Sequence, residues 1–544
     1  MQHLVDLLPP CYTWPIRKHG FKTLRWLFLS HFITQSKMSH IARSALIIAV
    51  FFGLEKVLGF LRQLLIARQI GLSAAYDVFN AANNLPDLIF GLISGGALAI
   101  AFIPVLTEYL EEKGRPQMWD LFSRVANLIF LVTAGLSIIV ALLANQLVGW
   151  DLGIAPGFSA EQQSQVVDLM RLNLIATMLF SISGLVIAGL QANQHFLLPA
   201  LARSMYDIGT LIGVIFLAPS TGYQIGSITL PAFGLGIYGL VYGTVLGAAL
   251  FLGIQVPGLF RYQFHWVAKI NLHHPGVQKV LRVMGPRIGN MFFIYLVLIY
   301  IPDNIASRLV TGSITALVFG WLFLQVPETL LGTAIGTALL PTISEQYVRR
   351  EKTIFIQSLN RALRVILALT IPVAVLVALV IEPVAGLFGF DQMGTDLVVW
   401  TSRAFLLGLA GHAMLEIASR GFYAQQDAVT PLWASALMAA IFTTLAILFA
   451  RSIGAPGIAL ANSVAFTVEA LLLWYLHNRN FPGVLRVRPT VLRTLLAAVV
   501  AGLVVFFIMQ LPFPSLLLAV GGLVIGALIV LPFIWPEVKV LIRL

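Results

Sequence analysis

The sequence has little charge and a single cysteine. Asp, Glu, Lys and Arg make up only 10% of the 544 residues, whereas about a quarter of a soluble globular chain is charged. So few charges cannot cover a water-exposed surface of this size, which excludes a cytosolic enzyme, a secreted domain and a disordered chain. The single Cys11 excludes an internal disulfide and a cysteine-based zinc or iron–sulfur framework.

Long apolar runs account for most of the chain, which is 59% hydrophobic. The runs last about 20 residues and do not alternate with a period of two, which favours membrane-spanning helices over a membrane β-barrel. We therefore expect an all-α polytopic membrane protein with about fourteen transmembrane helices. The expected spans are residues 42–67, 75–106, 120–148, 166–191, 200–218, 234–257, 283–302, 315–343, 362–386, 397–420, 431–450, 455–476, 490–511 and 514–535.

Residues 1–37 precede the first expected span and form an N-terminal extension. Its apolar stretch, residues 26–33, is too short to cross a bilayer. Two interpretations stay open. The extension is either an interfacial or signal-like segment, or it is untranslated or disordered and translation starts at Met38; we expect the second.

Lys and Arg gather in alternate loops. Every second loop along the chain is basic, and the loops between these basic loops hold only Arg68, Arg308 and Arg451. Because cytoplasmic loops carry the excess of Lys and Arg, this pattern predicts that both termini are cytoplasmic. It also accounts for the net charge of +11 without a nucleic-acid partner. The basic set comprises Lys113 and Arg115, Arg203, residues 261–282, residues 349–364, Arg420, residues 479–493 and the C-terminal tail.

Two motifs occur twice. Residues 189–199 and 421–431 share the pattern G-x-x-A-x-Q-x-x-x-x-P, and residues 101–108 are similar to residues 338–345. Both separations correspond to six expected spans, which predicts two parallel six-helix lobes followed by two extra helices. Parallel repeats are typical of transporters whose substrate site lies between the halves. The expected parts are an N-lobe at 38–262, a C-lobe at 263–480, and helices 13 and 14 with a cytoplasmic tail at 481–544.

The first expected span carries charges on one face. Glu55, Lys56, Gly59 and Arg62 fall within about a third of the helix circumference. Ionisable side chains inside a membrane are costly and are therefore candidates for function. The face predicts an anion site in a cavity; the alternatives are an internal salt bridge or snorkelling of Arg62 to the interface.

Further polar residues lie on the second, eighth and tenth spans. The stripe on the second span surrounds Pro86, which predicts a bent cavity wall or simple interhelical hydrogen bonding. On the tenth span a histidine and a carboxylate share one face, as in a proton relay or a structural pair. Asp207 and Glu469 have no partner that the sequence assigns. The cavity-lining candidates are Glu55, Asn80, Asn84, Asp87, Gln325, Glu328, His412, Glu416 and Arg287.

No enzyme motif is present. The sequence contains no P-loop, no H-E-x-x-H and no G-x-S-x-G, and its loops are too short for a catalytic domain. We therefore expect a transporter that uses no cofactor and no metal. A polytopic glycosyl or phosphoglycosyl transferase is the alternative from another class, and it would need a charged cluster in a sizeable external loop.

Several strings together resemble the MurJ/MviN family, the lipid II flippases of the MOP exporter superfamily. The resemblance covers roughly residues 38–540. It implies two six-helix lobes plus two helices in a bacterial inner membrane. The strings are Lys56-Val-Leu-Gly-Phe-Leu-Arg62, Asn84-Leu-Pro86-Asp87, Ala101-Phe-Ile-Pro104, Gly336-Thr-Ala-Leu-Leu-Pro341 and Gly421-Phe-Tyr-Ala424 to Thr430-Pro431.

The resemblance also implies an activity. A flippase of this family moves lipid II, the undecaprenyl-pyrophosphate-linked disaccharide-pentapeptide used in peptidoglycan biosynthesis, from the cytoplasmic to the outer leaflet by alternating access. Cavity cations would hold the pyrophosphate, and bilayer lipids and the cell-wall synthesis machinery would be partners. The resemblance places substrate-binding residues at Lys56, Arg62 and Asp77.

The chain departs from the family pattern at several cavity positions. Family arginines fall on Phe90 and Leu322, a family glutamate falls on Gly95, and Lys56 replaces an arginine. Either other residues such as Arg287 compensate, or the cargo is another polyprenyl-linked oligosaccharide. Some members bind sodium through carboxylates on helices 7 and 11, but residues 431–450 contain no acidic residue, so we do not expect sodium coupling.

The distribution of Lys and Arg makes the topology testable. We predict that a cysteine placed at Arg349 or Arg350 reacts with a membrane-impermeant thiol reagent only from the cytoplasmic side, and that one at Asp391 reacts only from outside. Labelling of intact and permeabilised cells measures this. Equal labelling of both positions from outside would contradict the fourteen-span topology.

Overall fold

The computed structural model describes residues 40–93 and 96–541. The chain divides into two units, Met1–Ile47 and Ile48–Leu544, and all that follows concerns the second unit. The predicted extension at residues 1–37 lies outside the described residues.

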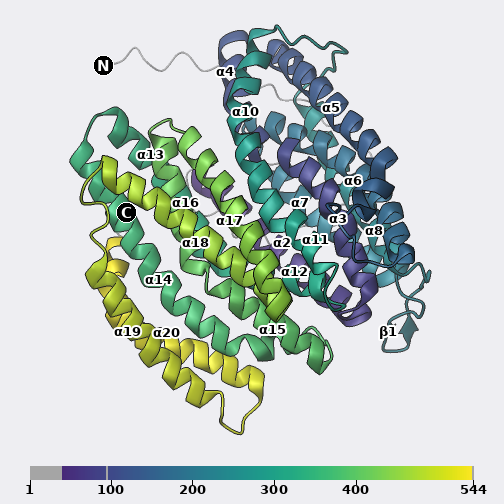
Figure 1. Ribbon diagram of the computed structural model, residues 1–544. Helices are drawn as coiled ribbons and strands as arrows, with labels where there is room; N and C mark the ends of the chain where they lie inside the picture. The colour runs from purple at the N-terminus through teal and green to yellow at the C-terminus, as the bar shows by residue number, and fades with distance from the viewer. Residues whose placement is uncertain (1–39, 94–95, 542–544) are drawn as a thin grey trace, which may run out of the picture. The chain divides into compact units, whose positions relative to one another are not determined.

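The described chain is a succession of helices (Figure 1). The first half contains α2 (His40–Ile70), α3 (Ala74–Ile93), α4 (Gly96–Lys113), α5 (Arg115–Gly149), α6 (Ala160–Ala192), α7 (Leu197–Ile212), the π-helical turn η1 (Gly213–Leu217), α8 (Ile237–Gly253) and α9 (Val256–Arg261). A short antiparallel hairpin of β1 (Gln224–Ile225) and β2 (Ile228–Thr229) lies between η1 and α8, with Ile225 opposite Ile228.

The second half repeats the pattern and adds a final helix pair. It contains α10 (Pro275–Tyr295), the π-helical turn η2 (Leu296–Tyr300), α11 (Ile301–Ala306), α12 (Ser313–Glu328), the π-helical turn η3 (Thr329–Thr333), α13 (Ala334–Val348), α14 (Lys352–Gly386), α15 (Gln392–Leu406), α16 (Leu409–Ala424), α17 (Val429–Ile453), α18 (Ala455–Asn480), α19 (Arg488–Ile508) and α20 (Ser515–Leu541). The pair α19–α20 packs on α14.

Each expected span coincides with one helix or with consecutive helices, which confirms the all-α polytopic fold. Among the described residues, ten helices are long and apolar enough to cross a membrane, or eleven if α15 and α16, bent by 42°, form one span. The other three expected spans correspond to α2, to α3 with α4, and to α10 with α11. The number fourteen stays a prediction.

The repeated motif forms the same turn twice. Gln194 and Gln426 occupy equivalent motif positions, and both adopt left-handed backbone conformations, with φ of 60° and 61°. In each copy the preceding amide side chain, of Asn193 or Gln425, donates a 2.9 Å hydrogen bond to the carbonyl of the motif's first glycine. Non-glycine residues rarely adopt positive φ. The shared conformation therefore supports two structurally equivalent lobes.

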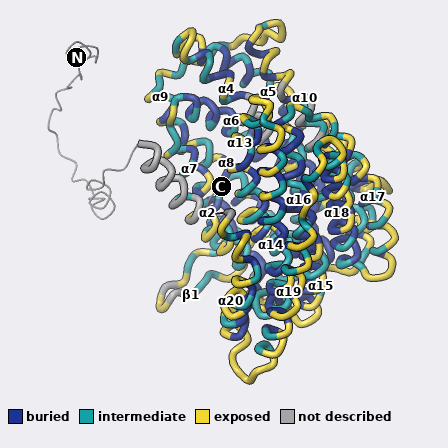
Figure 2. The backbone as a smooth tube through the Cα atoms, turned by 90° about the vertical axis from the view of Figure 1, so that its left-hand side faces the viewer, coloured by how far each residue is buried: buried dark blue, intermediate teal, exposed yellow. Residues whose placement is uncertain are grey.

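Large apolar side chains cover the outer faces of the helices. Leu496 and Phe507 on α19 and Leu528 on α20 are 56%, 63% and 62% exposed. Figure 2 shows the turn between these two helices as exposed. Each such side chain left in water forgoes about 1.5–3 kcal/mol of burial energy. A surface of this kind requires lipid around it.

The two lobes have separate cores at one end of the bundle. We call this the basic end, because it carries the basic loops at residues 261–282 and 349–364. There the N-lobe core surrounds Trp119, and the C-lobe core surrounds Trp474. The first half of α10 belongs to the N-lobe core through Val277, Val280 and Met284. The lobe boundary at residue 263 stays a prediction, since α10 packs with both lobes.

At the opposite end the cores combine residues of both lobes. One cluster joins Val78 of α3 and Val166 of α6 to Phe442 of α17. Another cluster joins Ile66 of α2 to Phe319 of α12 and to other residues of α14 and α15. Burial of shared apolar side chains therefore holds the lobes together at the end opposite the basic loops.

Asp77 joins the lobes by capping a helix of the other lobe. Its carboxylate accepts hydrogen bonds from the Gly312 N–H (2.6 Å), the Thr315 N–H (2.8 Å) and the Thr315 hydroxyl (2.7 Å). Gly312 is the N-cap of α12 and offers no side chain of its own. A carboxylate at this position satisfies free backbone donors and the helix dipole together.

Two asparagines of α3 continue this junction. Asn80 donates to the Thr315 hydroxyl (3.1 Å), and Asn84 donates to Asp303 of α11 (2.8 Å). These bonds support the interpretation of the stripe as interhelical hydrogen bonding, and a cavity wall lined by Asn80 and Asn84 stays a prediction.

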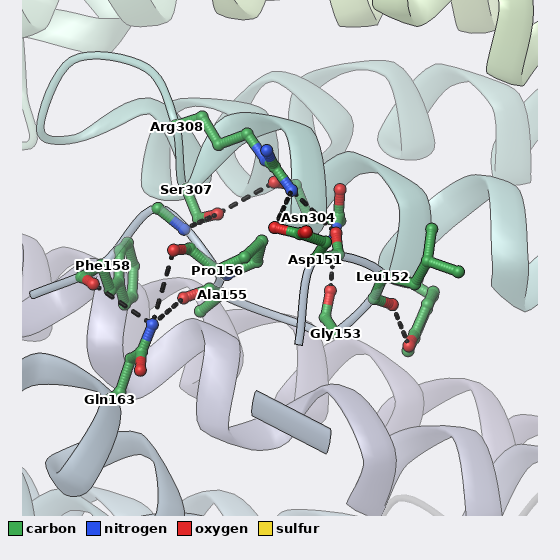
Figure 3. Close-up of polar contacts among 12 residues, drawn as sticks. Asp151, Leu152, Gly153, Ala155, Pro156, Phe158, Gln163, Asn304, Ser307 and Arg308 are labelled. Atoms are coloured by element: carbon green, nitrogen blue, oxygen red, sulfur yellow. Dashed lines mark hydrogen bonds and ion pairs between the residues drawn. The ribbon is translucent and has the colours of Figure 1, made fainter. Parts of the chain in front are cut away.

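The loop between α5 and α6 completes the junction (Figure 3). The Asn304 side chain donates to the carbonyls of Asp151 (3.0 Å) and Gly153 (2.5 Å), and Arg308 donates to the same Asp151 carbonyl (2.7 Å). The Gly157 N–H donates to the Ser307 hydroxyl (3.2 Å). These bonds fix an N-lobe loop to the end of α11.

The cap predicts how the junction can be weakened. Replacing Asp77 with Ala leaves first-turn N–H groups of α12 without an acceptor, which costs about 0.5–2 kcal/mol. Asp77→Asn keeps one acceptor oxygen and serves as the control. The distance distribution between spin labels at Glu161 and Gln392, at the starts of α6 and α15, should become longer and broader in Asp77→Ala but not in Asp77→Asn. An unchanged distribution would contradict the assignment.

Candidate functional site

The charged face of α2 lies against α7. Arg62 forms an ion pair with Asp207 of α7, with 3.1 Å between Nη1 and Oδ1. The Arg62 guanidinium also lies 5.3 Å from the centre of the Tyr206 ring. Asp207 is buried (5% exposed) and Arg62 is half-buried (24% exposed). Arg62 is therefore a fixed, partly accessible cation inside the helix bundle.

A second, looser group lies closer to the basic end on the same two helices. The Glu55 carboxylate lies 3.8 Å from the Lys56 amine and 3.7 Å from the Arg203 guanidinium of α7. The Lys56 and Arg203 side chains are 74% and 47% exposed. Gly59, between the two groups, brings α2 near Asp207, since an added Cβ would lie 3.8 Å from its carboxylate.

The two groups together carry an excess of positive charge. Three cations, Lys56, Arg62 and Arg203, face two carboxylates, Glu55 and Asp207. Carboxylates that hold cations in place lower the cost of keeping them away from bulk water. The excess charge and the exposed ammonium and guanidinium groups leave the cluster able to bind an anion.

The structure adds residues that the sequence analysis did not assign. Arg203 was counted as a loop charge and Asp207 had no partner, yet both belong to the α2–α7 cluster. They are four residues apart on α7, so both point to the same side of that helix. This spacing was the one signal that the sequence offered. Which helix the pair would face could not be read from it.

Asp77 lies apart from the cluster. It is 3% exposed, and three hydrogen bonds from α12 occupy its carboxylate. Asp87, further along α3, is exposed. Substrate contact by Asp77 stays a prediction, and the role that its geometry supports is the junction between the lobes.

The C-lobe candidates lie on neighbouring helices around Arg420, which interacts electrostatically with Glu328 as well as with Glu416. On α12–α13, Gln325 is exposed and Glu328 accepts a 3.1 Å hydrogen bond from the Thr333 hydroxyl. On α16, Glu416 pairs with Arg420, whose Nη2 donates to the Thr337 hydroxyl of α13 (3.2 Å). Arg420 thus joins two helices of the C-lobe.

His412 does not face Glu416. Its Nε2 lies 3.0 Å from the Asn462 side-chain oxygen, and its ring stacks on Phe466 at 4.0 Å. The imidazole is 6% exposed, and the geometry favours a structural role over a proton relay. A place for His412 on the cavity wall stays a prediction. Arg287 lies in α10, but its side chain is not among those described.

The positions of the two missing family arginines are apolar. Phe90 packs on Phe180 of α6, with ring centres 5.5 Å apart. Leu322 lies against the apolar cluster that joins the lobes. Neither position supplies a cation. The α2–α7 cluster is therefore the main group of cations at the predicted site among the described side chains.

Comparison with known proteins gives one consistent result. The family model described as lipid II flippase MurJ matches residues 66–521. The lipid II flippase MurJ of Burkholderia cenocepacia is 29% identical over 443 residues, covering 79% of this chain and 83% of that protein. The probable lipid II flippase MurJ of Vibrio cholerae is 25% identical, covering 82% and 84%.

Solved structures show the same fold. A lipid II flippase MurJ in an inward closed conformation superposes with a TM-score of 0.74 at 21% identity, covering 92% of this chain and 100% of that one. An inward-facing MATE family multidrug transporter of the MOP superfamily gives a TM-score of 0.65 at 13% identity, with coverage of 80% and 98%. The family match over most of the sequence confirms the resemblance: this chain belongs to the lipid II flippase MurJ family.

Proposed function

We propose that this protein is a lipid II flippase of a bacterial inner membrane, and that it moves the pyrophosphate-linked glycolipid from the cytoplasmic to the outer leaflet. The observation that carries the proposal is the excess of positive charge on α2 and α7 of an apolar helix bundle, where Arg62 and Asp207 are shielded and Lys56 and Arg203 are exposed. A pyrophosphate drawn into such a bundle needs compensating charge, because an unpaired buried anion costs several kcal/mol. Family membership supports the same substrate.

The arrangement of the lobes supports alternating access. The lobes share cores at the end opposite the basic loops, and they have separate cores at the basic end. Since basic loops lie in the cytoplasm, the closed end faces outward and both termini are cytoplasmic. The cation cluster then lies on the side from which lipid II enters. Bilayer lipids and the cell-wall synthesis machinery are the proposed partners.

A flippase for another polyprenyl-linked oligosaccharide is the second candidate. The apolar residues Phe90 and Leu322, at positions where the family pattern has arginines, favour it. Complementation of a strain depleted of its own lipid II flippase decides between the two. Growth on expression of this chain supports lipid II as cargo. Failure of a well-expressed, membrane-inserted chain would contradict it.

In the same assay Arg62→Ala should abolish complementation. The loss of the guanidinium removes the deepest cation and leaves the buried Asp207 without its partner, and breaking a buried pair costs about 3–5 kcal/mol. The double variant Arg62→Ala/Asp207→Asn removes the orphaned charge and controls for folding. It should insert normally and still fail to transport. Full activity of a well-expressed double variant would refute the site.

Lys56 tests the same site by a milder change. Lys56→Ala should complement poorly, because the exposed amine is lost from the cluster. Lys56→Arg should be tolerated, since a guanidinium keeps the charge and adds the planar fork that suits phosphate groups. Growth rates at matched membrane expression measure both. Equal growth of the alanine variant and the parent would argue against a substrate contact at this position.

A further inference from the structure

Glu55 lies between two cations without a hydrogen bond to either. Its distances to Lys56 and Arg203 are 3.8 Å and 3.7 Å, beyond the range of a hydrogen bond. Its Oε2 is shielded from solvent and has no hydrogen-bond partner. A shielded carboxylate oxygen without a hydrogen bond is costly. The Glu55 carboxylate is therefore held by charge alone, and loosely.

The neighbouring pair is built differently. Arg62 and Asp207 are 3.1 Å apart, Asp207 is 5% exposed, and the Tyr206 ring flanks the guanidinium. The same two helices thus carry a tight inner pair and a loose outer group. Arg203 precedes Asp207 by one helical turn, so the outer group lies about 6 Å nearer the basic end.

We propose that Lys56 and Arg203 form an entry pair for the pyrophosphate of the substrate, and that Glu55 is the internal anion that occupies this pair when no substrate is bound. The assignment rests on the proposed function and adds Arg203 and Glu55 to its binding site. On binding, phosphate oxygens take the place of the Glu55 carboxylate beside both cations. Arg62 lies one to two helical turns deeper on α2.

The chemistry favours such an exchange. An arginine fork binds phosphate oxygens through two parallel, charge-assisted hydrogen bonds of about 2.7–2.9 Å. The Glu55 contacts are longer than this, and a pyrophosphate carries more negative charge than one carboxylate. The substrate therefore forms short, charge-assisted hydrogen bonds with the entry pair that Glu55 does not form. Because Glu55 competes for the same cations, it also weakens binding and helps release.

A purely structural role for Glu55 makes the opposite prediction. If Glu55 only neutralised the two cations so that α2 and α7 could pack, its removal would leave mutual repulsion and disturb the site. Binding would then weaken. If Glu55 is the competing anion, its removal strengthens binding. The sign of one change in affinity therefore separates the two roles.

The test is direct binding of farnesyl pyrophosphate to the purified full chain in nanodiscs, with farnesol as the uncharged reference. Glu55→Gln should bind farnesyl pyrophosphate about fivefold more tightly, as expected for removal of one partly exposed competing charge. Arg203→Gln should bind about tenfold more weakly, the loss of one charge-assisted contact. In an Arg203→Gln background, Glu55→Gln should gain less than it does alone.

Arg171 and Asp168 on α6 provide a matched control. They form an exposed ion pair at 3.9 Å on α6, where Arg171 also donates to the Ala141 carbonyl of α5. Arg171→Gln and Asp168→Asn should leave the affinity unchanged. Thermal unfolding of every variant should match the parent within a few degrees, which separates a binding effect from misfolding.

The outcomes are distinct. Weaker binding in Glu55→Gln, or parental affinity in Arg203→Gln, would overturn the entry pair while leaving the flippase proposal intact. Equal affinity of the parent chain for farnesyl pyrophosphate and farnesol would instead overturn the proposed pyrophosphate site as a whole. Tighter binding in Glu55→Gln with weaker binding in Arg203→Gln supports the exchange.

Discussion

A charge inside an apolar helix bundle must have a partner, and the structure of this protein follows from that constraint. Arg62 is held by Asp207, and Lys56 and Arg203 are held by Glu55. Without these carboxylates, three cations on two neighbouring helices would repel one another in a medium that solvates them poorly. With them, α2 and α7 are joined by ion pairs between their side chains and still retain a net positive charge for an anionic substrate.

The same constraint decides where the lobes meet. Backbone donors at the start of α12 need an acceptor, and Asp77 of the other lobe supplies it. Asn84 likewise donates a hydrogen bond to Asp303 across the junction. Polar groups thus join the lobes at the end opposite the basic loops. If the lobes separated there without admitting water, each group would lose its hydrogen-bond partner, which costs free energy. Separation of the lobes at this end must therefore admit water to these polar groups.

Much of the fold was predictable from the sequence, because helix length and apolar content are local properties. The expected spans match the helices, and the twice-occurring motif forms the same turn at Gln194 and Gln426. The differences arise where helices break. The span at 397–420 bends by 42° between α15 and α16, and π-helical turns interrupt the spans at 283–302 and 315–343. Such breaks depend on packing against neighbours rather than on local composition.

The sequence by itself determined the membrane character of the chain, the two-lobe repeat and the common face of Lys56 and Arg62, since helical geometry fixes which residues of one helix lie together. Tertiary structure decided the partners. The Asp77 carboxylate accepts a hydrogen bond from Gly312, which lies 235 residues further along the chain. Asp207 forms an ion pair with Arg62, although the sequence pattern of neither helix indicates the other helix. Partner choice depends on how helices pack in space, and one-dimensional spacing does not encode that.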